Sequence, residues 1–235
     1  MSDKTELAGL EAGELAELTL GLYFLFWSSL LFVLALTESL VWPALQTFSV
    51  IFLGGSGVGM VAGARHLHRV SALGKPWRRR TRNLLIATAT LAYLSLFYML
   101  WRRLPTNLYL LGHALAFFGL VIVVLGLFGP MVMQLARAAG LPNLAIQCVV
   151  FSVIAILLLG LAYVLVAETM VRVVRQGGDP FVTVQFWLMR MPLWTALLIF
   201  LPVILSPIAL MLSLLWEAKG LALEPLLAKR SSPAQ

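Results

Sequence analysis

Charged residues are what this sequence has least of. Only 11% of its 235 residues are Asp, Glu, Lys or Arg, whereas 61% are hydrophobic. A soluble domain carries about 25% charged residues and roughly half apolar ones. A globule of this size cannot hide so much apolar surface from water, so lipid must cover part of it. The composition therefore excludes a soluble domain and indicates an integral membrane protein.

The sequence also lacks the motifs of membrane-embedded enzymes. It contains no His-Glu-x-x-His, Gly-x-Ser-x-Gly or Ser-x-x-Lys pattern, and no Asp-rich site for a divalent ion and a diphosphate substrate. Intramembrane hydrolysis therefore has no visible catalytic residues. No Asp, Glu, Lys or Arg falls in the middle of an apolar run, which removes the usual parts of a proton relay or ion-coupled pump. These absences favour a non-enzymatic protein.

Cysteine is nearly absent too, and histidine is scarce. Cys148 is the only cysteine and lies in an apolar run, so it forms no internal disulfide and reads as a small buried hydrophobe. We predict no metal site and no cofactor. The net charge of +7 does not indicate nucleic acid, because the basic residues lie beside apolar runs, as an orienting signal does.

Long apolar runs make up most of the chain, and they predict an all-α transmembrane bundle of about six spans, since a span takes about 20 residues. The predicted spans cover residues 18–37, 42–64, 84–101, 108–136, 144–167 and 192–216. The predicted segments outside them are an acidic N-terminal segment at 1–17, a basic loop at 65–83, an amphipathic interfacial segment at 168–191 and a short tail at 217–235.

Basic residues are distributed unevenly between the two sides of this predicted bundle. With six spans both termini lie on one side, and that side receives 12 of the 17 Lys and Arg residues. Because positive charge is retained in the cytoplasm, we predict cytoplasmic termini and a bacterial-type inner membrane. In the basic loop, four arginines are expected to contact anionic lipid headgroups: Arg78, Arg79, Arg80 and Arg82.

Glycines at regular spacing predict two faces for close helix packing, where another backbone can approach. One series lies in the second predicted span and one in the fourth: Gly55, Gly59 and Gly63, and Gly112, Gly119 and Gly126. Prolines predict irregular helices in two spans. Pro130 is expected to kink or break the fourth span, which is too long to cross straight, and Pro202 and Pro207 to bend the sixth.

A few ionisable residues are candidate functional groups. His113 lies inside the fourth predicted span, where an imidazole is either functional or satisfied by a helix neighbour. His66 and His68 fall at the opposite end of the bundle, so they cannot share a haem with His113. Four charged residues are predicted at the outer face, either as a headgroup or partner site or as ordinary interfacial charge: Arg102, Arg103, Glu168 and Arg172.

Three functions are compatible with these features. The leading prediction is a packing or accessory subunit of a larger membrane complex, with other subunits or a second copy as partners. The first alternative is a small transporter or channel built around broken fourth and sixth helices. The second alternative is a haem- or quinone-linked redox protein, which would depend on His113 alone.

Overall fold

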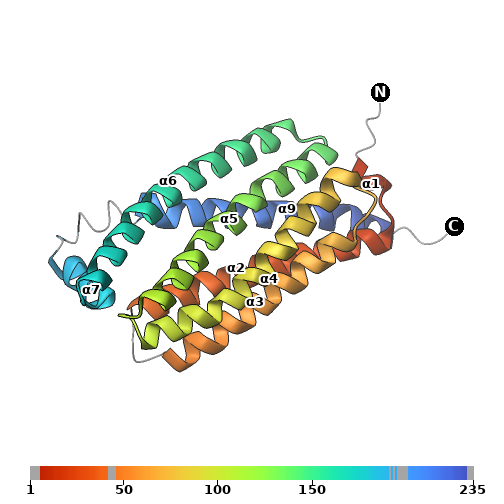
Figure 1. The fold of residues 1–235 in the computed structure, drawn as a ribbon. Coiled ribbons are helices and arrows are strands. Elements are labelled where there is room, and N and C mark those ends of the chain that lie inside the picture. The colour runs from red at the N-terminus through yellow and green to blue at the C-terminus, as the bar shows by residue number, and fades with distance from the viewer. Residues whose placement is uncertain (1–5, 42–45, 191, 193, 195–200, 232–235) are drawn as a thin grey trace.

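The structure is a computed structural model that describes residues 6–41, 46–190, 192, 194 and 201–231 (Figure 1). The elements are α1 (Glu6–Gly9), α2 (Ala12–Val41), α3 (Gln46–Arg69), α4 (Gly74–Arg103), α5 (Leu108–Ala138), α6 (Pro142–Arg175), α7 (Pro180–Arg190), the π-helical segment η2 (Leu201–Leu205) and α9 (Ser206–Ser231). Within these residues six helices are long and apolar enough to cross a membrane, and no strand is present. The prediction of an all-α, multi-span membrane protein is confirmed.

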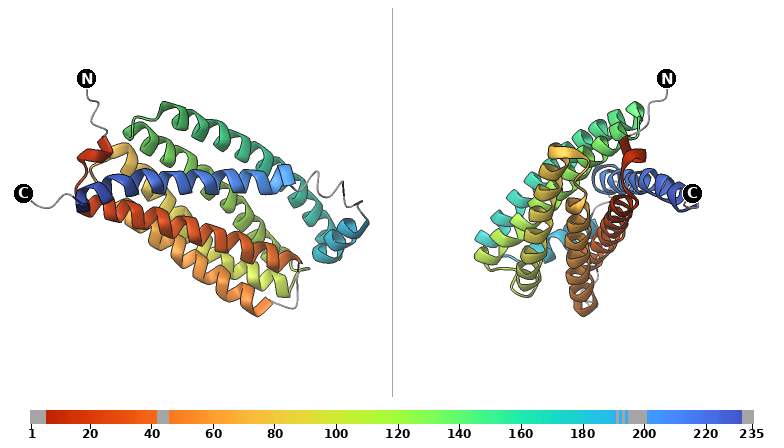
Figure 2. Two further views of the ribbon diagram at one scale, coloured as in Figure 1. Left: turned by 180° about the vertical axis from the view of Figure 1, so that it is seen from behind. Right: turned by 90° about the vertical axis from the view of Figure 1, so that its right-hand side faces the viewer.

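The long helices pack as sequential neighbours from α2 to α6, and α9 returns along α2 and also contacts α5 and α6 (Figures 1 and 2). The described ends of the chain meet at one end of the bundle, where the Lys229 ammonium donates a hydrogen bond to the carbonyl of Leu10. We call this end the polar end. Helix α7 lies at the other end and runs across the direction of α6 (Figure 1).

Short turns with specific chemistry set the ends of the helices. Gly74, Gly140 and Gly177 have φ values of 83°, 72° and 75°, a left-handed conformation that glycine adopts without steric cost. At the start of α7, the Asp179 carboxylate accepts a 2.8 Å hydrogen bond from the amide of Phe181, and Pro180 occupies the first helical position. These residues let the chain reverse direction between two helices within a few positions.

The helices extend beyond the predicted spans into three of the segments predicted to lie outside them. The basic loop at 65–83 is mostly helical, because α3 continues to Arg69 and α4 begins at Gly74. Helix α6 continues to Arg175, which leaves only α7 as a separate element of the predicted interfacial segment. The predicted tail is helical as far as Ser231. Charged residues with good helix propensity prolong a helix outside the apolar core, where hydropathy no longer detects it.

The prolines behave differently from one another. Helix α5 continues through Pro130, so the helix is not broken there, and the predicted kink stays a prediction. In the sixth span, Pro202 lies in the π-helical turn η2, and Pro207 follows as the second residue of α9. A π-helical turn is one way in which membrane helices accommodate a missing backbone donor. Residues 195–200 of this predicted span lie outside the described residues.

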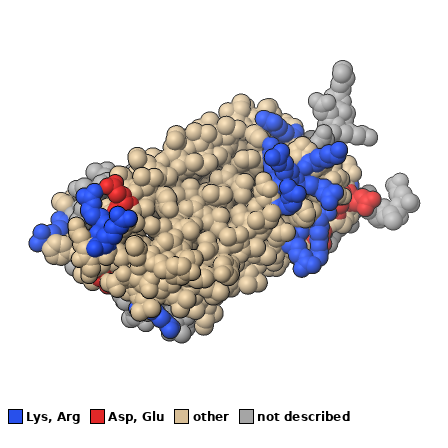
Figure 3. All heavy atoms as spheres, in the orientation of Figure 1, with Lys and Arg blue, Asp and Glu red and all other residues tan. Residues whose placement is uncertain are grey.

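Charged side chains gather at both ends of the bundle and leave an uncharged band between them (Figure 3). Along α4, Arg82 and Arg102 are 20 residues apart, and along α2 Glu17 and Glu38 are 21 residues apart. At 1.5 Å per residue both separations are about 30 Å, which is the thickness of the hydrocarbon core. The bundle is therefore dimensioned for a bilayer, with the helices projecting from it at the polar end.

Candidate functional site

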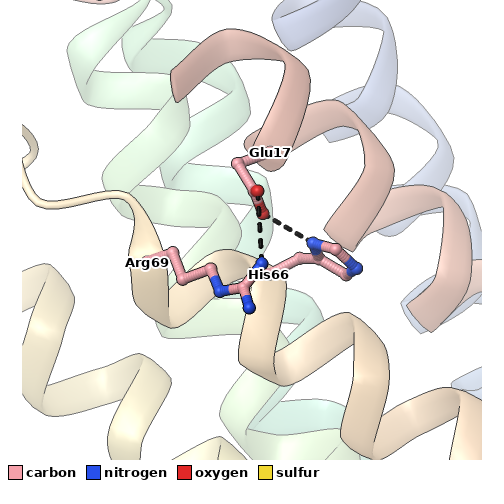
Figure 4. Close-up of polar contacts among 3 residues, drawn as sticks. All are labelled: Glu17, His66 and Arg69. Atoms are coloured by element: carbon pink, nitrogen blue, oxygen red, sulfur yellow. Dashed lines mark hydrogen bonds and ion pairs between the residues drawn. The ribbon is translucent and has the colours of Figure 1, made fainter. Parts of the chain in front are cut away.

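At the polar end, an ionic contact joins α2 to α3 (Figure 4). The Glu17 carboxylate accepts a 2.5 Å hydrogen bond from Nδ1 of His66, and Nη1 of Arg69 lies 3.4 Å from its other oxygen. The His66 ring is stacked against Phe24, with their centroids 5.9 Å apart. The two basic residues are three apart on α3, so they share the helix face that meets α2. Glu17 thus links the first two long helices through these two contacts.

A second acid of α2 caps the turn between α3 and α4. One carboxylate oxygen of Glu14 accepts hydrogen bonds from the backbone amides of Ser71 and Ala72, at 3.2 and 3.1 Å, and from the Ser71 hydroxyl at 3.3 Å. These amides would otherwise lack partners in the turn. The sequence signal was present, because an acidic N-terminal segment faces a basic region, but the pairing of particular residues was not predictable.

Arg80 differs from the three arginines with which it was grouped. Its Nη1 donates hydrogen bonds to the carbonyl of Pro130 at 2.6 Å and to the side-chain oxygen of Gln134 at 3.1 Å. The Gln134 amide in turn donates to the carbonyl of Leu73. Arg80 therefore holds α4 to α5 instead of facing lipid headgroups. Arg78, Arg79 and Arg82 are exposed, and their headgroup contact stays a prediction.

The two histidines of α3 turn toward different helices, as their spacing predicts. His66 faces α2, whereas Nδ1 of His68 lies 3.2 Å from the hydroxyl of Thr81 on α4. His113 is on the second turn of α5, beyond the whole length of α4, so it cannot share a ligand with either. No group of three His, Cys, Asp or Glu residues that could hold a metal occurs among the described positions.

The intramembrane histidine of α5 is satisfied by its own helix and by aromatic neighbours. Nδ1 of His113 lies 2.9 Å from the carbonyl of Tyr109, one turn earlier, and the ring stacks on Phe97 at a centroid distance of 4.5 Å. The Tyr109 ring is also 4.5 Å away. This arrangement is the helix-neighbour hydrogen bond that makes an imidazole tolerable within a membrane.

The four charged residues predicted at the outer face do not form one cluster. Glu168 and Arg172 pair along α6 at 2.7 Å, as their spacing predicts, and both side chains are mostly exposed. Arg102 instead places its guanidinium 4.4 Å from the centre of the Phe181 ring and so contacts α7, while Arg103 is exposed. An exposed pair of this kind contributes little to stability.

The first glycine series is divided between the inside and the outside of the bundle. A Cβ atom at Gly63 would lie 2.8 Å from the Gly21 carbonyl oxygen, and one at Gly59 would collide with the Ser28 side chain. Both glycines therefore pack directly against α2. At Gly55, by contrast, nothing described lies within 4 Å of the corresponding position, and the residue is exposed.

The second series is divided in the same way. Gly126 and Gly119 face Ile156 and Tyr163 of α6, at 3.0 and 3.5 Å from the Cβ position, whereas Gly112 has no described atom within 4 Å. Among the glycines of α5, Gly129 has the tightest contact with α6, because a Cβ atom there would overlap the Ser152 hydroxyl. Gly129 belongs to neither glycine series, so the sequence analysis did not predict this contact.

A cavity of about 500 Å³, lined by both apolar and polar residues, lies between α6 and α9 near the polar end. Its polar lining consists of Asn143, Gln147, Glu217 and Glu224. Because α9 continues to Ser231, the two acids belong to a helix packed in the bundle and not to a free tail.

No family model, no curated protein and no solved structure matches this chain. Its function is therefore inferred from the contacts described above.

Proposed function

We propose that this protein is a non-enzymatic integral membrane protein that packs as an accessory subunit against another membrane protein or a second copy of itself. The observation that supports this function is the division of the two glycine series. Within the chain, Gly59 and Gly63 bring α3 against α2, and Gly119 and Gly126 bring α5 toward α6. Gly55 and Gly112, which continue the same series, are open to the outside of the bundle.

A glycine on the outside of the bundle lowers the stability of its helix, and packing against a partner helix offsets this loss. Glycine is less favourable than alanine in a helix interior by about 1 kcal/mol, and lipid chains gain nothing from its small size. A second helix does gain, because small residues let two backbones approach in a membrane. On α5, Gly112 is followed one turn later by the exposed Ala116, which extends the small-residue surface.

The rest of the molecule offers little with which to act alone. The described connections 70–73, 104–107, 139–141 and 176–179 are each short, so little of the described chain lies outside the helices. At the polar end, Glu14, Glu17 and Arg80 are engaged in holding helices together. Most of the surface of the described chain is apolar helix, which favours a role in packing against another membrane protein.

The orientation belongs to this proposal. The polar end carries the excess of Lys and Arg, so we place it, with both termini, in the cytoplasm of a bacterial-type inner membrane. Arg102, Arg172 and α7 then lie at the outer surface.

Replacing Gly55 or Gly112 by leucine should remove the partner while leaving the fold intact. In the isolated chain the added side chain would project outward without a clash. At an interface it would hold the two helix backbones apart. We expect at least an order-of-magnitude loss of co-purifying partner, about 1.4 kcal/mol, after extraction in mild detergent. The measurement is pull-down with quantitative mass spectrometry.

The matched control is Ala89→Leu, which introduces the same leucine side chain at an exposed position of α4, with an increase in size smaller by one carbon atom. It should retain the partner. Isolation of the wild-type protein as a stable monomer, with no stoichiometric companion and no self-association, would contradict the proposed function.

A transporter or channel is the second candidate, and one observation favours it. The π-helical turn η2 precedes α9 in the sixth span, and a cavity lined in part by Gln147, Glu217 and Glu224 lies beside α9. Such irregular helices border binding sites in transporters. The uninterrupted α5 removes the other broken helix on which this function would depend.

A further inference from the structure

A groove lies on the outer side of the α5–α6 turn, separate from the contacts that hold the bundle together. Its volume is about 380 Å³. One cation and a run of apolar residues line it: Arg137, Pro142, Ala145, Ile146, Val149 and Val150. The groove is therefore amphipathic, with one cationic side chain at one end and apolar side chains along the rest.

The charge of Arg137 is not neutralised within the described part of the chain. Its side chain is exposed, and no described residue forms a hydrogen bond or ion pair with it. The neighbouring Arg80 is close enough to repel it electrostatically, and Arg80 is itself bound to a carbonyl and an amide, which carry no charge. Two guanidinium groups at this corner of the bundle therefore lack an anion.

The two acids of α9 that line the neighbouring cavity are not part of this groove. Glu217 and Glu224 line the cavity on the α9 side of α6, which shares only Pro142 with the groove. A guanidinium presents paired N–H donors that match phosphate oxygens in geometry as well as in charge. The Arg137 side chain is therefore suited to bind a phosphate, and no described residue competes with a phosphate for it.

The length of the groove and the change in polarity along it also match those of a phospholipid. From Pro142 to Val150 it follows α6 for eight residues, or about 12 Å. It starts in the polar layer and ends in the uncharged part of α6, which has no Asp, Glu, Lys or Arg between residues 143 and 167. A soluble anion would use only the Arg137 end, whereas a phospholipid would use both ends.

We propose that this groove binds one anionic phospholipid, with its phosphate on Arg137 and an acyl chain along Val149 and Val150. The excess positive charge of Arg80 and Arg137 selects an anionic headgroup over a zwitterionic one. The site is independent of the subunit surface at Gly55 and Gly112.

The test is native mass spectrometry of the purified full chain in detergent, with phosphatidylglycerol or phosphatidylcholine added. The wild type should retain one phosphatidylglycerol in preference to phosphatidylcholine. Arg137→Gln and Val149→Trp, which remove the phosphate partner and fill the groove, should each weaken phosphatidylglycerol binding about tenfold. Val149 is 47% exposed, so tryptophan there does not enter the core.

Two matched variants control for charge and for size. Arg65→Gln removes an exposed cation from the same end, and Leu161→Trp enlarges an exposed residue of α6 outside the groove. Both should bind as the wild type does. Ile146→Trp repeats the groove-filling test should Val149→Trp not fold, as judged by its melting curve.

Three results would overturn the proposal. Equal retention of the two lipids by the wild type would remove the anionic preference. Equal losses in Arg65→Gln and Arg137→Gln would mean diffuse attraction to the basic end. Displacement of phosphatidylglycerol by millimolar inorganic phosphate, with no effect of either tryptophan, would identify the occupant as a soluble anion.

Discussion

Replacing Gly63 by alanine should destabilise the folded protein by about 1–3 kcal/mol, and leucine should prevent folding altogether. The new Cβ atom would lie 2.8 Å from the carbonyl oxygen of Gly21 and 3.0 Å from the amide nitrogen of Leu25. Both are backbone atoms of α2, so no side chain can rotate away and the whole helix must move. Thermal or denaturant unfolding in detergent measures the effect.

The same change at Gly55 is the matched control, because it lies on the same helix and in the same series. No described atom is within 4 Å of its Cβ position, so alanine there should leave the stability of the isolated chain unchanged or raise it slightly. A stable Gly63→Ala protein together with a destabilised Gly55→Ala protein would reverse the assignment of the inner and outer ends of this series.

Replacing Arg80 by leucine should have the second largest effect, a loss of about 2–3 kcal/mol of stability. Hydrogen bonds to charged groups contribute about 1.5–3 kcal/mol, and leucine removes both the one to Pro130 and the one to Gln134. Lysine should recover only part of the loss, since it has no planar fork with which to reach two acceptors. The measurement is again unfolding in detergent.

Arg79→Leu provides the comparison, since Arg79 is exposed one residue earlier on α4. We expect a change within about 0.5 kcal/mol, as for most surface substitutions. Equal stability of the Arg79 and Arg80 variants would mean that Arg80 faces the membrane surface like its neighbours and does not hold α5.

The sequence predicts the membrane-spanning helices well because lipid imposes a simple requirement on them. Every long apolar run had to become a helix, since backbone polar groups in a bilayer are satisfied only within the segment. The ends of the helices were less predictable. Arg69, Lys75 and Glu217 are charged, so hydropathy places them in loops, yet each continues a helix above the membrane.

Individual side-chain roles were predictable only where the helix itself determined them. The Glu168–Arg172 pair and the hydrogen bond of His113 to its own helix follow from spacing along one helix. Arg80 and Gly129 depend on which helix packs beside them, and spacing within one segment carries no such information. For the same reason the glycine series showed where packing could occur but not which glycines pack inside the chain.

Labelling of single cysteines in intact cells tests the six-span topology and its orientation most directly. In a Cys148→Ser background, cysteine is placed at four exposed positions, three in connections between helices and one at the start of α6: Ala72, Thr106 and Gln176, and Asn143. A membrane-impermeant maleimide should label positions 106 and 176 in intact cells, and positions 72 and 143 only after permeabilisation. Labelling of positions 72 and 106 from the same side would contradict a membrane-spanning α4, and with it the six-span bundle.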